Sequence, residues 1–341
     1  MVGSSLAWSL MLCSWWVAAD PDLKKGVTDP SQADADFAIQ GEYSGSACLW
    51  GCRQQMGLQV VALGDGRFDA LLYPGGLPGN GYNGGVKSKL SGQREGDRVI
   101  LQGERVSATL QTGFAVILTD RAGQLLGYLQ PMHRYSLTAG APPPPGAVVL
   151  FDGRPSNRLK NATISENGLL QVGAETVDAY RDFILHAEFK TPYMPYARGQ
   201  ARGNSGFYLQ QRYEVQVLDS FGLESQNNDA GGLYKFKAPD LNMCFPPLSW
   251  QTYDIHFQAA RFDDAGTKVE NARITVWHNG VVIHNQVSLE NKTGGGKPEA
   301  AQPLPILFQN HGNPVEFRNV WLVDRSATPA TCVPQPSCCG R

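Results

Sequence analysis

The sequence has few charged residues, no dense stretch of Lys or Arg, and no long hydrophobic run after Ala19. Its 29 Lys and Arg and 31 Asp and Glu make 18% of the 341 residues charged, against about 25% in a typical soluble domain. The net charge of −2 supplies no basic field that attracts phosphates, so we expect no nucleic-acid partner. The scarcity of charge also argues against coiled coils and long exposed helices.

Glycine and proline, by contrast, are abundant, at 38 and 22 residues. This composition is typical of short strands joined by many turns. The length suits about two domains of roughly 150 residues each. We therefore predict an all-β protein with two antiparallel domains.

The N-terminus resembles a secretory signal peptide. Leu6 to Val17 is mostly apolar and Val17-Ala18-Ala19 ends in small residues, which predicts a signal peptide over 1–19 and cleavage after Ala19. An uncleaved anchor is the alternative, but the apolar run is short for a bilayer. We expect a periplasmic or extracellular protein with no membrane span after cleavage.

Cleavage would remove Cys13 and leave six cysteines, which allow 15 pairings in an oxidising compartment. Cys48 and Cys52 are close enough in sequence for a local disulfide. The other four are Cys244, Cys332, Cys338 and Cys339, the last three in a Cys/Pro-rich tail over 326–341. Zinc binding by these cysteines is the alternative to disulfides, but no His stands at matching spacing in the tail.

A polyproline stretch, Gly140 to Gly146, marks the clearest boundary. It predicts a stiff linker over 139–147 between an N-terminal β domain of unknown role (37–138) and a second β domain (148–325). The first domain shows short β-type runs at 58–63, 67–73, 98–102, 114–119 and 125–130. Its glycine-rich stretch, Tyr73 to Gly85, lacks the closing Gly-Lys-Ser/Thr of a phosphate loop, so we interpret it as a long hairpin loop, with a ligand role as the alternative.

The second domain has longer alternating runs. Phe183, Leu185, Ala187 and Phe189 share one face of a predicted strand. Asn279-Gly280 between two apolar runs predicts a type I′ hairpin, because both central positions of that turn need positive φ. About ten such runs predict two antiparallel sheets packed as a sandwich or jelly roll.

Polar residues gather along one predicted strand, Tyr213 to Asp219. Glu214 and Gln216 share the face opposite the core, and Asp219 joins them only if the strand bulges or ends near Leu218. Two carboxylates and an amide in one strip suit a sugar-processing site. A merely solvated strand face is the alternative, and periodicity alone favours it.

Five segments in order carry a family resemblance. They are Phe151-Asp-Gly153, Gly203-Asn-Ser-Gly-Phe-Tyr-Leu209, Tyr213-Glu-Val-Gln-Val-Leu-Asp219, Trp250-x-x-Tyr253 and Gln309-Asn-His-Gly-Asn-Pro-Val-Glu-Phe-Arg-Asn-Val-Trp321. Together they resemble the 3-keto-disaccharide hydrolase domain family over about 148–324. The resemblance implies a concanavalin A-like jelly roll that acts on glycosides already oxidised to a ketone at C3. Such a substrate in turn implies an upstream sugar 3-dehydrogenase as a pathway partner.

A C3 ketone acidifies the C2 proton, so a base can remove it, the C1 group can leave, and water can add back. We expect Glu214 and His311 to share the roles of base and acid, with Asp219 orienting the histidine. Substrate contacts are expected from Asn204, Gln216, Tyr234, Lys235, Gln309 and Asn310, with Lys235 as a cation for the ketone oxygen. The strand also resembles the Glu-x-Asp-x-x-Glu strand of jelly-roll endoglucanases, but Gln216 and Asp219 depart from that pattern, which argues against double displacement.

The cofactor and the class of function stay open at this point. No motif requires a cofactor, and a divalent metal ion, with Asp229 as one ligand, is the only cofactor we consider. The competing function is a non-catalytic, lectin-like carbohydrate-binding module. It needs hydroxyl-bridging groups and an aromatic platform, but no titrating group with a perturbed pKa.

Overall fold

The computed structural model describes residues 23–49 and 51–326. The predicted signal peptide, most of the Cys/Pro-rich tail and its three cysteines lie outside these residues. No helix in the described part of the chain is long and apolar enough to cross a membrane. The short 3-10 turns η1 (Pro30–Gln32) and η2 (Gly199–Ala201) are its helical elements.

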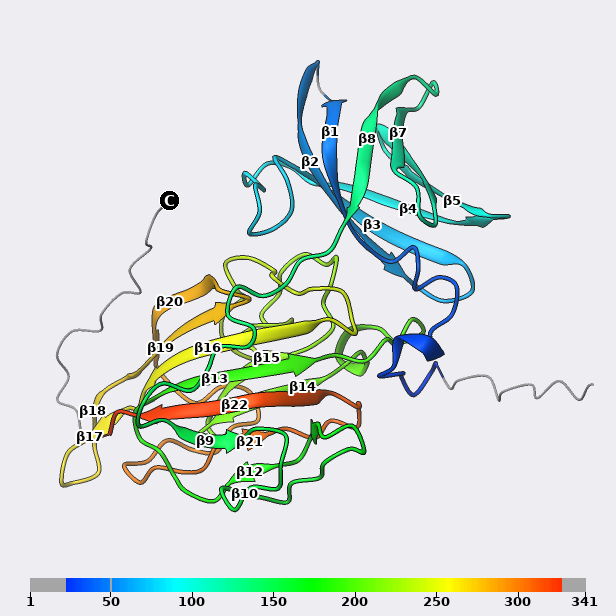
Figure 1. Cartoon of the computed structure of the whole chain (residues 1–341). Coiled ribbons are helices and arrows are strands. Elements are labelled where there is room, and N and C mark those ends of the chain that lie inside the picture. The colour runs from blue at the N-terminus through cyan, green and yellow to red at the C-terminus, as the bar shows by residue number, and fades with distance from the viewer. Residues whose placement is uncertain (1–22, 50, 327–341) are drawn as a thin grey trace, which may run out of the picture.

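The N-terminal domain is a closed barrel in which each strand pairs antiparallel with the next and β8 returns to β1 (Figure 1). Successive side chains of each strand point alternately into and out of the barrel. In β6, Val106, Ala108 and Leu110 are buried and the residues between them are half-buried. The strands are β1 (Gly41–Leu49), β2 (Cys52–Ala62), β3 (Arg67–Pro74), β4 (Ser88–Glu95), β5 (Arg98–Gly103), β6 (Val106–Gln111), β7 (Val116–Asp120) and β8 (Leu125–Met132). The five predicted runs correspond to β2, β3, β5, β7 and β8, whereas β1, β4 and β6 were not predicted.

The C-terminal domain is a sandwich of a seven-stranded and a five-stranded sheet. The larger sheet holds β9 (Val148–Phe151), β11 (Leu170–Gln171), β13 (Phe183–Lys190), β16 (Trp250–Gln258), β19 (Ala272–His278), β20 (Val281–Leu289) and β22 (Glu316–Asp324). The smaller holds β10 (Leu159–Lys160), β12 (Glu175–Thr176), β14 (Ser205–Leu209), β15 (Tyr213–Val217) and β21 (Leu307–Phe308). A separate pair joins β17 (Arg261–Phe262) to β18 (Lys268–Glu270).

Both sheets contribute to one apolar core. Phe207 of the smaller sheet contacts Tyr253 and Phe317 of the larger one, with ring centroids 6.1 and 5.4 Å apart. The predicted core face of β13, Phe183 to Phe189, is buried. At the turn between β19 and β20, Asn279 and Gly280 have φ of 54° and 80°, so the predicted hairpin is confirmed, as is the all-β fold.

The linker does not act as a free spacer. Residues 136–141, which include the start of the linker, lie across the outer face of the larger sheet, where Ser136 Oγ is 2.5 Å from Thr252 Oγ1 and the Gly140 N–H donates to Glu188 at 2.6 Å. Trp321 donates from Nε1 to the Ala141 carbonyl at 3.0 Å. In Figure 1 this segment descends from β8 to the sandwich. The sequence predicts a spacer because the proline content indicates a stiff chain. It does not show which polar groups of the sandwich will bind that chain.

Beneath this segment lies a charged cluster centred on the buried side chains of His186 and Glu188. His186 Nδ1 is 2.7 Å from Asp254, and Asn319 donates to Glu188 at 2.8 Å. Arg318 pairs with Glu188 at 2.7 Å. Burial disfavours the charged imidazole, but the hydrogen bonds and charges of Asp254 and Glu188 outweigh burial and raise the pKa of His186 to about 9.

Because the pKa of His186 is raised, the stability of the protein should fall at alkaline pH. The stabilisation from protonated His186 is complete below its unfolded-state pKa and is lost as pH rises through about 9; a shift of this size corresponds to about 3 kcal/mol. We expect the free energy of unfolding, measured in urea from pH 6 to pH 10, to fall in the wild type and to stay flatter in His186→Gln. The control is His256→Gln, because burial lowers the pKa of the His256 imidazole and its loss should leave the alkaline fall unchanged. An equally steep fall in His186→Gln would contradict this assignment.

The two domains share an interface. Val61 of the barrel packs with Leu218, Phe221 and other apolar residues of the sandwich. Arg134, just after β8, lies over the Phe245 ring at 4.9 Å. This contact brings the barrel against the segment that follows β15.

The local disulfide prediction is wrong. Cys48, Cys52 and Cys244 are free thiols in the described chain. Cys52 pairs with Leu49, and Cys48 pairs with Arg53. Paired residues share a face and successive residues alternate, so Cys48 and Cys52 point to opposite sides of the sheet.

Candidate functional site

The register of β14 and β15 assembles a polar group on the outer face of the smaller sheet. Tyr208 pairs with Glu214, and Gly206 pairs with Gln216. Tyr213, Val215 and Val217 turn into the core, so their polar neighbours take the other face. The predicted pairing of Glu214 and Gln216 on one face is therefore what the structure shows.

Glu214 is the most unusual of these residues. Its side chain is buried, and Oε2 has no hydrogen-bond partner. Burial raises the pKa of the Glu214 carboxyl to about 7, although the hydrogen bond from Tyr208 lowers it in part. A carboxyl of this kind exchanges a proton near neutral pH, as a general base or acid must.

Gly206 makes room for this carboxyl. A Cβ at position 206 would lie 2.5 Å from Glu214 Oε1, so the carboxylate extends over a position without a side chain. On the other flank, the Tyr234 N–H donates to the Glu214 carbonyl at 3.2 Å. Tyr234 is half-buried, so Glu214 has two tyrosine neighbours, Tyr208 through its side chain and Tyr234 through its backbone.

Three amides continue the strip beyond Glu214. The Gln216 side-chain amide lies 3.2 Å from that of Asn204 and 3.1 Å from that of Gln200. With its amide oxygen and nitrogen exchanged, Gln216 donates to Glu214 Oε1 at 2.9 Å. Asn204 donates to the Gln200 carbonyl at 2.8 Å. The amides therefore hold the carboxyl on one side and are themselves fixed.

Gln309 belongs to the same surface. Its N–H donates to the Gly206 carbonyl at 2.9 Å, and its carbonyl accepts from Ser205 at 2.7 Å. The side-chain Oε1 is buried without a partner. Glu214 on β15 and Gln309 just after β21 thus each bring an unsatisfied acceptor to the strands on either side of β14.

The loop after Gln309 lies at the edge of this group. Asn204 donates its N–H to Asn313 at 2.8 Å, which holds the loop against the strip. His311 and Asn310 are exposed, and Asn310 accepts from the Gly312 N–H at 2.9 Å. No hydrogen bond or ion pair of His311 is found within residues 23–49 and 51–326.

Lys235 is exposed, and its Nζ lies 5.4 Å from the centre of the Tyr234 ring. This places its charge beside Tyr234 rather than against Glu214. Of the two predicted substrate contacts Tyr234 and Lys235, it is therefore Tyr234 that bonds directly to Glu214, through its backbone N–H.

The predicted pairing of Asp219 with His311 is wrong. Asp219 accepts from Arg202 Nε at 2.7 Å, and both side chains are almost fully buried. It also accepts from the Phe221 N–H at 3.3 Å. The chain leaves β15 after Val217, so Asp219 no longer follows the alternation that places Glu214 and Gln216.

The residues present do not form a clear metal site. No group of three or more His, Cys, Asp or Glu side chains with metal-binding geometry occurs in the described part of the chain. Asp229 is buried and accepts from the Gln226 N–H at 2.9 Å. Burial raises the pKa of Asp229 to about 6.

Comparison with protein families identifies the C-terminal domain. Residues 146–323 match the 3-keto-alpha-glucoside-1,2-lyase-like domain. The chain belongs to this family. The family resemblance expected from the five motifs is thereby confirmed, and the sandwich is a carbohydrate-acting or carbohydrate-binding domain.

Solved structures similar to this 3-keto-glucoside lyase-like protein cover about half of the chain. A protein assigned to the glycosyl hydrolases of Parabacteroides distasonis ATCC 8503 is 32% identical, with 53% of this chain and 84% of that chain covered and a TM-score of 0.49. A second from the same organism is 21% identical, covers 52% and 94% of the two chains, and has a TM-score of 0.37. No curated protein matches the chain.

Within the lyase-like domain, sequence reasoning missed Tyr208, Gly206 and Gln200. Tyr208 and Gly206 lie within a quoted motif, yet their position opposite Glu214 and Gln216 depends on strand register. The three-residue turn between Leu209 and Tyr213, in which Gln210 and Gln211 have φ of 51° and 54°, sets this register, and no Gly or Asn marks it in the sequence. Such a turn fixes which residues of the two strands face each other.

Proposed function

We propose that the sandwich cleaves glycosides that carry a ketone at C3 of the sugar. The base takes the C2 proton, the enolate expels the C1 substituent as the C1–O bond breaks, and that substituent leaves with a proton. Water then adds across C1 and C2, placing hydroxyl on C1 and hydrogen on C2. The net reaction is hydrolysis with no oxidant consumed.

The buried carboxyl of Glu214 is the observation that supports this proposal. It has one unpartnered oxygen and a pKa raised to about 7, which suits proton transfer at C2. Burial keeps the neighbouring Tyr208 phenol protonated by raising its pKa, so its hydroxyl donates to the Glu214 carboxylate and becomes available to a substrate oxygen once Glu214 has taken the C2 proton. The amides of Gln216 and Asn204, with Gln309 near them, supply partners for sugar hydroxyls.

His311 is the second candidate for proton transfer, at the leaving group. Its exposed loop is fixed to the strip through Asn313 and Asn204, which supports a role for His311 at the edge of the proposed site. Lys235 and Asn310 are the outer contacts of the proposed site. Asp219 is assigned to the fold rather than to the reaction.

The test follows one disaccharide in native and 3-keto forms with the full chain in D2O, with and without chelator. We expect sugar release and C2 deuterium incorporation from the keto form alone. Equal turnover of both forms, or release without exchange, would contradict the elimination route. Saturable binding without release would favour the lectin-like function, and loss of activity on chelation would assign a metal ion.

Gly206→Ala tests the position of the Glu214 carboxyl. The added methyl would meet Glu214 Oε1 at 2.5 Å, and a flexible side chain can move away. We expect kcat/KM on the keto substrate to fall by about 100-fold, with the melting temperature little changed. Gly295→Ala, whose Cβ would meet the Tyr208 hydroxyl at an ordinary 3.4 Å, is the nearby control, and equal losses in both variants would refute this geometry.

A further inference from the structure

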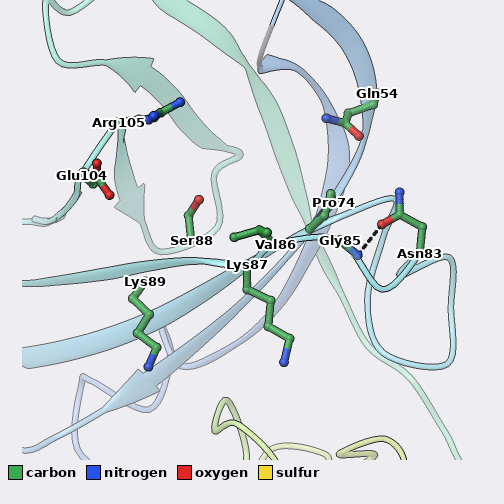
Figure 2. A pocket seen from close by; sticks show the side chains of 10 residues that line it. All are labelled: Gln54, Pro74, Asn83, Gly85, Val86, Lys87, Ser88, Lys89, Glu104 and Arg105. Carbon is green, nitrogen blue, oxygen red and sulfur yellow. Dashed lines mark hydrogen bonds between the residues drawn. The ribbon is translucent and has the colours of Figure 1, made fainter.

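The N-terminal barrel has a cleft of about 800 Å³ at one mouth. Figure 2 shows its lining: Gln54, Pro74, Asn83, Gly85, Val86, Lys87, Ser88, Lys89, Glu104 and Arg105. Strand direction brings these segments together, because β2 and β4 begin where β3 and β5 end. The glycine-rich loop between β3 and β4 borders the cleft, and barrel mouths are a common place for ligand sites.

Cations dominate the charged groups of this cleft. The charged lining residues are Lys87, Lys89 and Arg105 and a single acid, Glu104, and in Figure 2 the two lysines point to the other side of β4 from Arg105. Lys89 and Arg105 are exposed, and neither makes a hydrogen bond or ion pair with the described residues. Their charges are therefore available to an anionic ligand, with few internal acids to compete.

The remaining lining groups narrow the chemistry. Gln54, Asn83 and Ser88 offer hydrogen bonds suited to hydroxyls, and in Figure 2 Gln54 and Arg105 lie on either side of Ser88. No aromatic side chain is among the lining residues, so the platform on which neutral sugars commonly stack is missing. We propose that the cleft binds an acidic oligosaccharide long enough to span its mouth, with one carboxylate or sulfate group at Arg105 and another at Lys89 on the other side of β4.

This second site contacts the sandwich through Lys87. Its ammonium pairs with Glu224 at 2.6 Å and lies 5.7 Å from the centre of the Tyr73 ring. Glu224 follows the segment that leaves β15, the strand of Glu214. An acidic glycan bound at the cleft would be held on the same molecule as the proposed catalytic strip, independently of the reaction there.

Calorimetric titration of the full chain tests the proposal. The ligands are a trigalacturonate, a sulfated trisaccharide, the neutral methyl ester of the trigalacturonate and a short polyglutamate peptide. We expect saturable binding of at least one acidic sugar, about tenfold or more tighter than the ester, that weakens as salt screens the charges. Binding of the ester with equal affinity, of the peptide alone, or of no ligand would overturn the proposal.

Charge-neutralising variants locate the site. Lys89→Gln and Arg105→Gln should each weaken binding several-fold, and together by about tenfold or more. Arg98→Gln removes an exposed cation from the opposite mouth, at the start of β5, and should leave the affinity unchanged. Equal weakening by Arg98→Gln would indicate general charge attraction and refute the site. The C2 exchange assay should be unaltered in all three single variants, so failure here is distinguishable from failure at the sandwich.

Discussion

Glu214→Gln should abolish turnover of a 3-keto disaccharide, with kcat falling by about 1000-fold or more. The amide keeps the size and shape of the side chain but cannot accept the C2 proton. Deuterium incorporation at C2 should stop as well, because the same group performs both steps. Substrate affinity should weaken only modestly, since Gln216, Asn204 and Gln309 remain. Steady-state kinetics and mass spectrometry of the recovered sugar measure these effects.

The same variant should be more stable than the wild type above neutral pH. The folded-state pKa of Glu214 is raised to about 7, so ionisation costs stability as pH rises from the ordinary carboxyl range through 7; the cost is on the order of 3 kcal/mol. Glu214→Gln removes that cost, and its melting temperature should exceed the wild type's at pH 8 but not at pH 4.

Glu166→Gln is the matched control, because it neutralises an exposed carboxylate and should change neither activity nor stability. If Glu214→Gln keeps activity within about tenfold of the wild type, Glu214 is not the proton-transfer group. The base would then have to be sought at the exposed edge, where His311 lies.

Asp219→Ala should destabilise the protein by about 3 to 5 kcal/mol, because it leaves the Arg202 guanidinium buried without its partner. Both side chains of the pair are at most 4% exposed. The turnover number of the folded fraction should change little, since Asp219 contacts Arg202 and the Phe221 N–H rather than the catalytic strip. Urea unfolding and kinetics on the same samples separate the two effects.

Asp178→Ala provides the comparison for an exposed pair. Its partner is Arg158 and both side chains are 52% exposed, so the expected loss is below about 1 kcal/mol. The double variant Arg202→Met/Asp219→Leu should recover much of the lost stability. Normal stability together with lost turnover in Asp219→Ala would restore a catalytic role to Asp219.

The alternation of polar and apolar residues predicted the candidate site only within the regular part of the strand β15. Glu214 and Gln216 could be assigned to one face because side chains alternate along β15. Asp219 lies beyond the end of the strand, where its partner is chosen by the path of the chain and by the buried charge of Arg202. Tyr208 and Gly206 escaped prediction because alternation gives the face of each residue but not its neighbour across the sheet.

The sequence by itself determined the all-β class, the Asn279-Gly280 hairpin and the core face of β13, because each depends on residues close together along the chain. Tertiary structure alone decided the closure of the barrel, the docking of residues 136–141 over His186, the free state of Cys48 and Cys52, and the burial of Glu214. These features depend on contacts between distant segments. Burial in particular sets the pKa of Glu214, since a carboxyl loses its water only when the surrounding strands and loops have assembled around it.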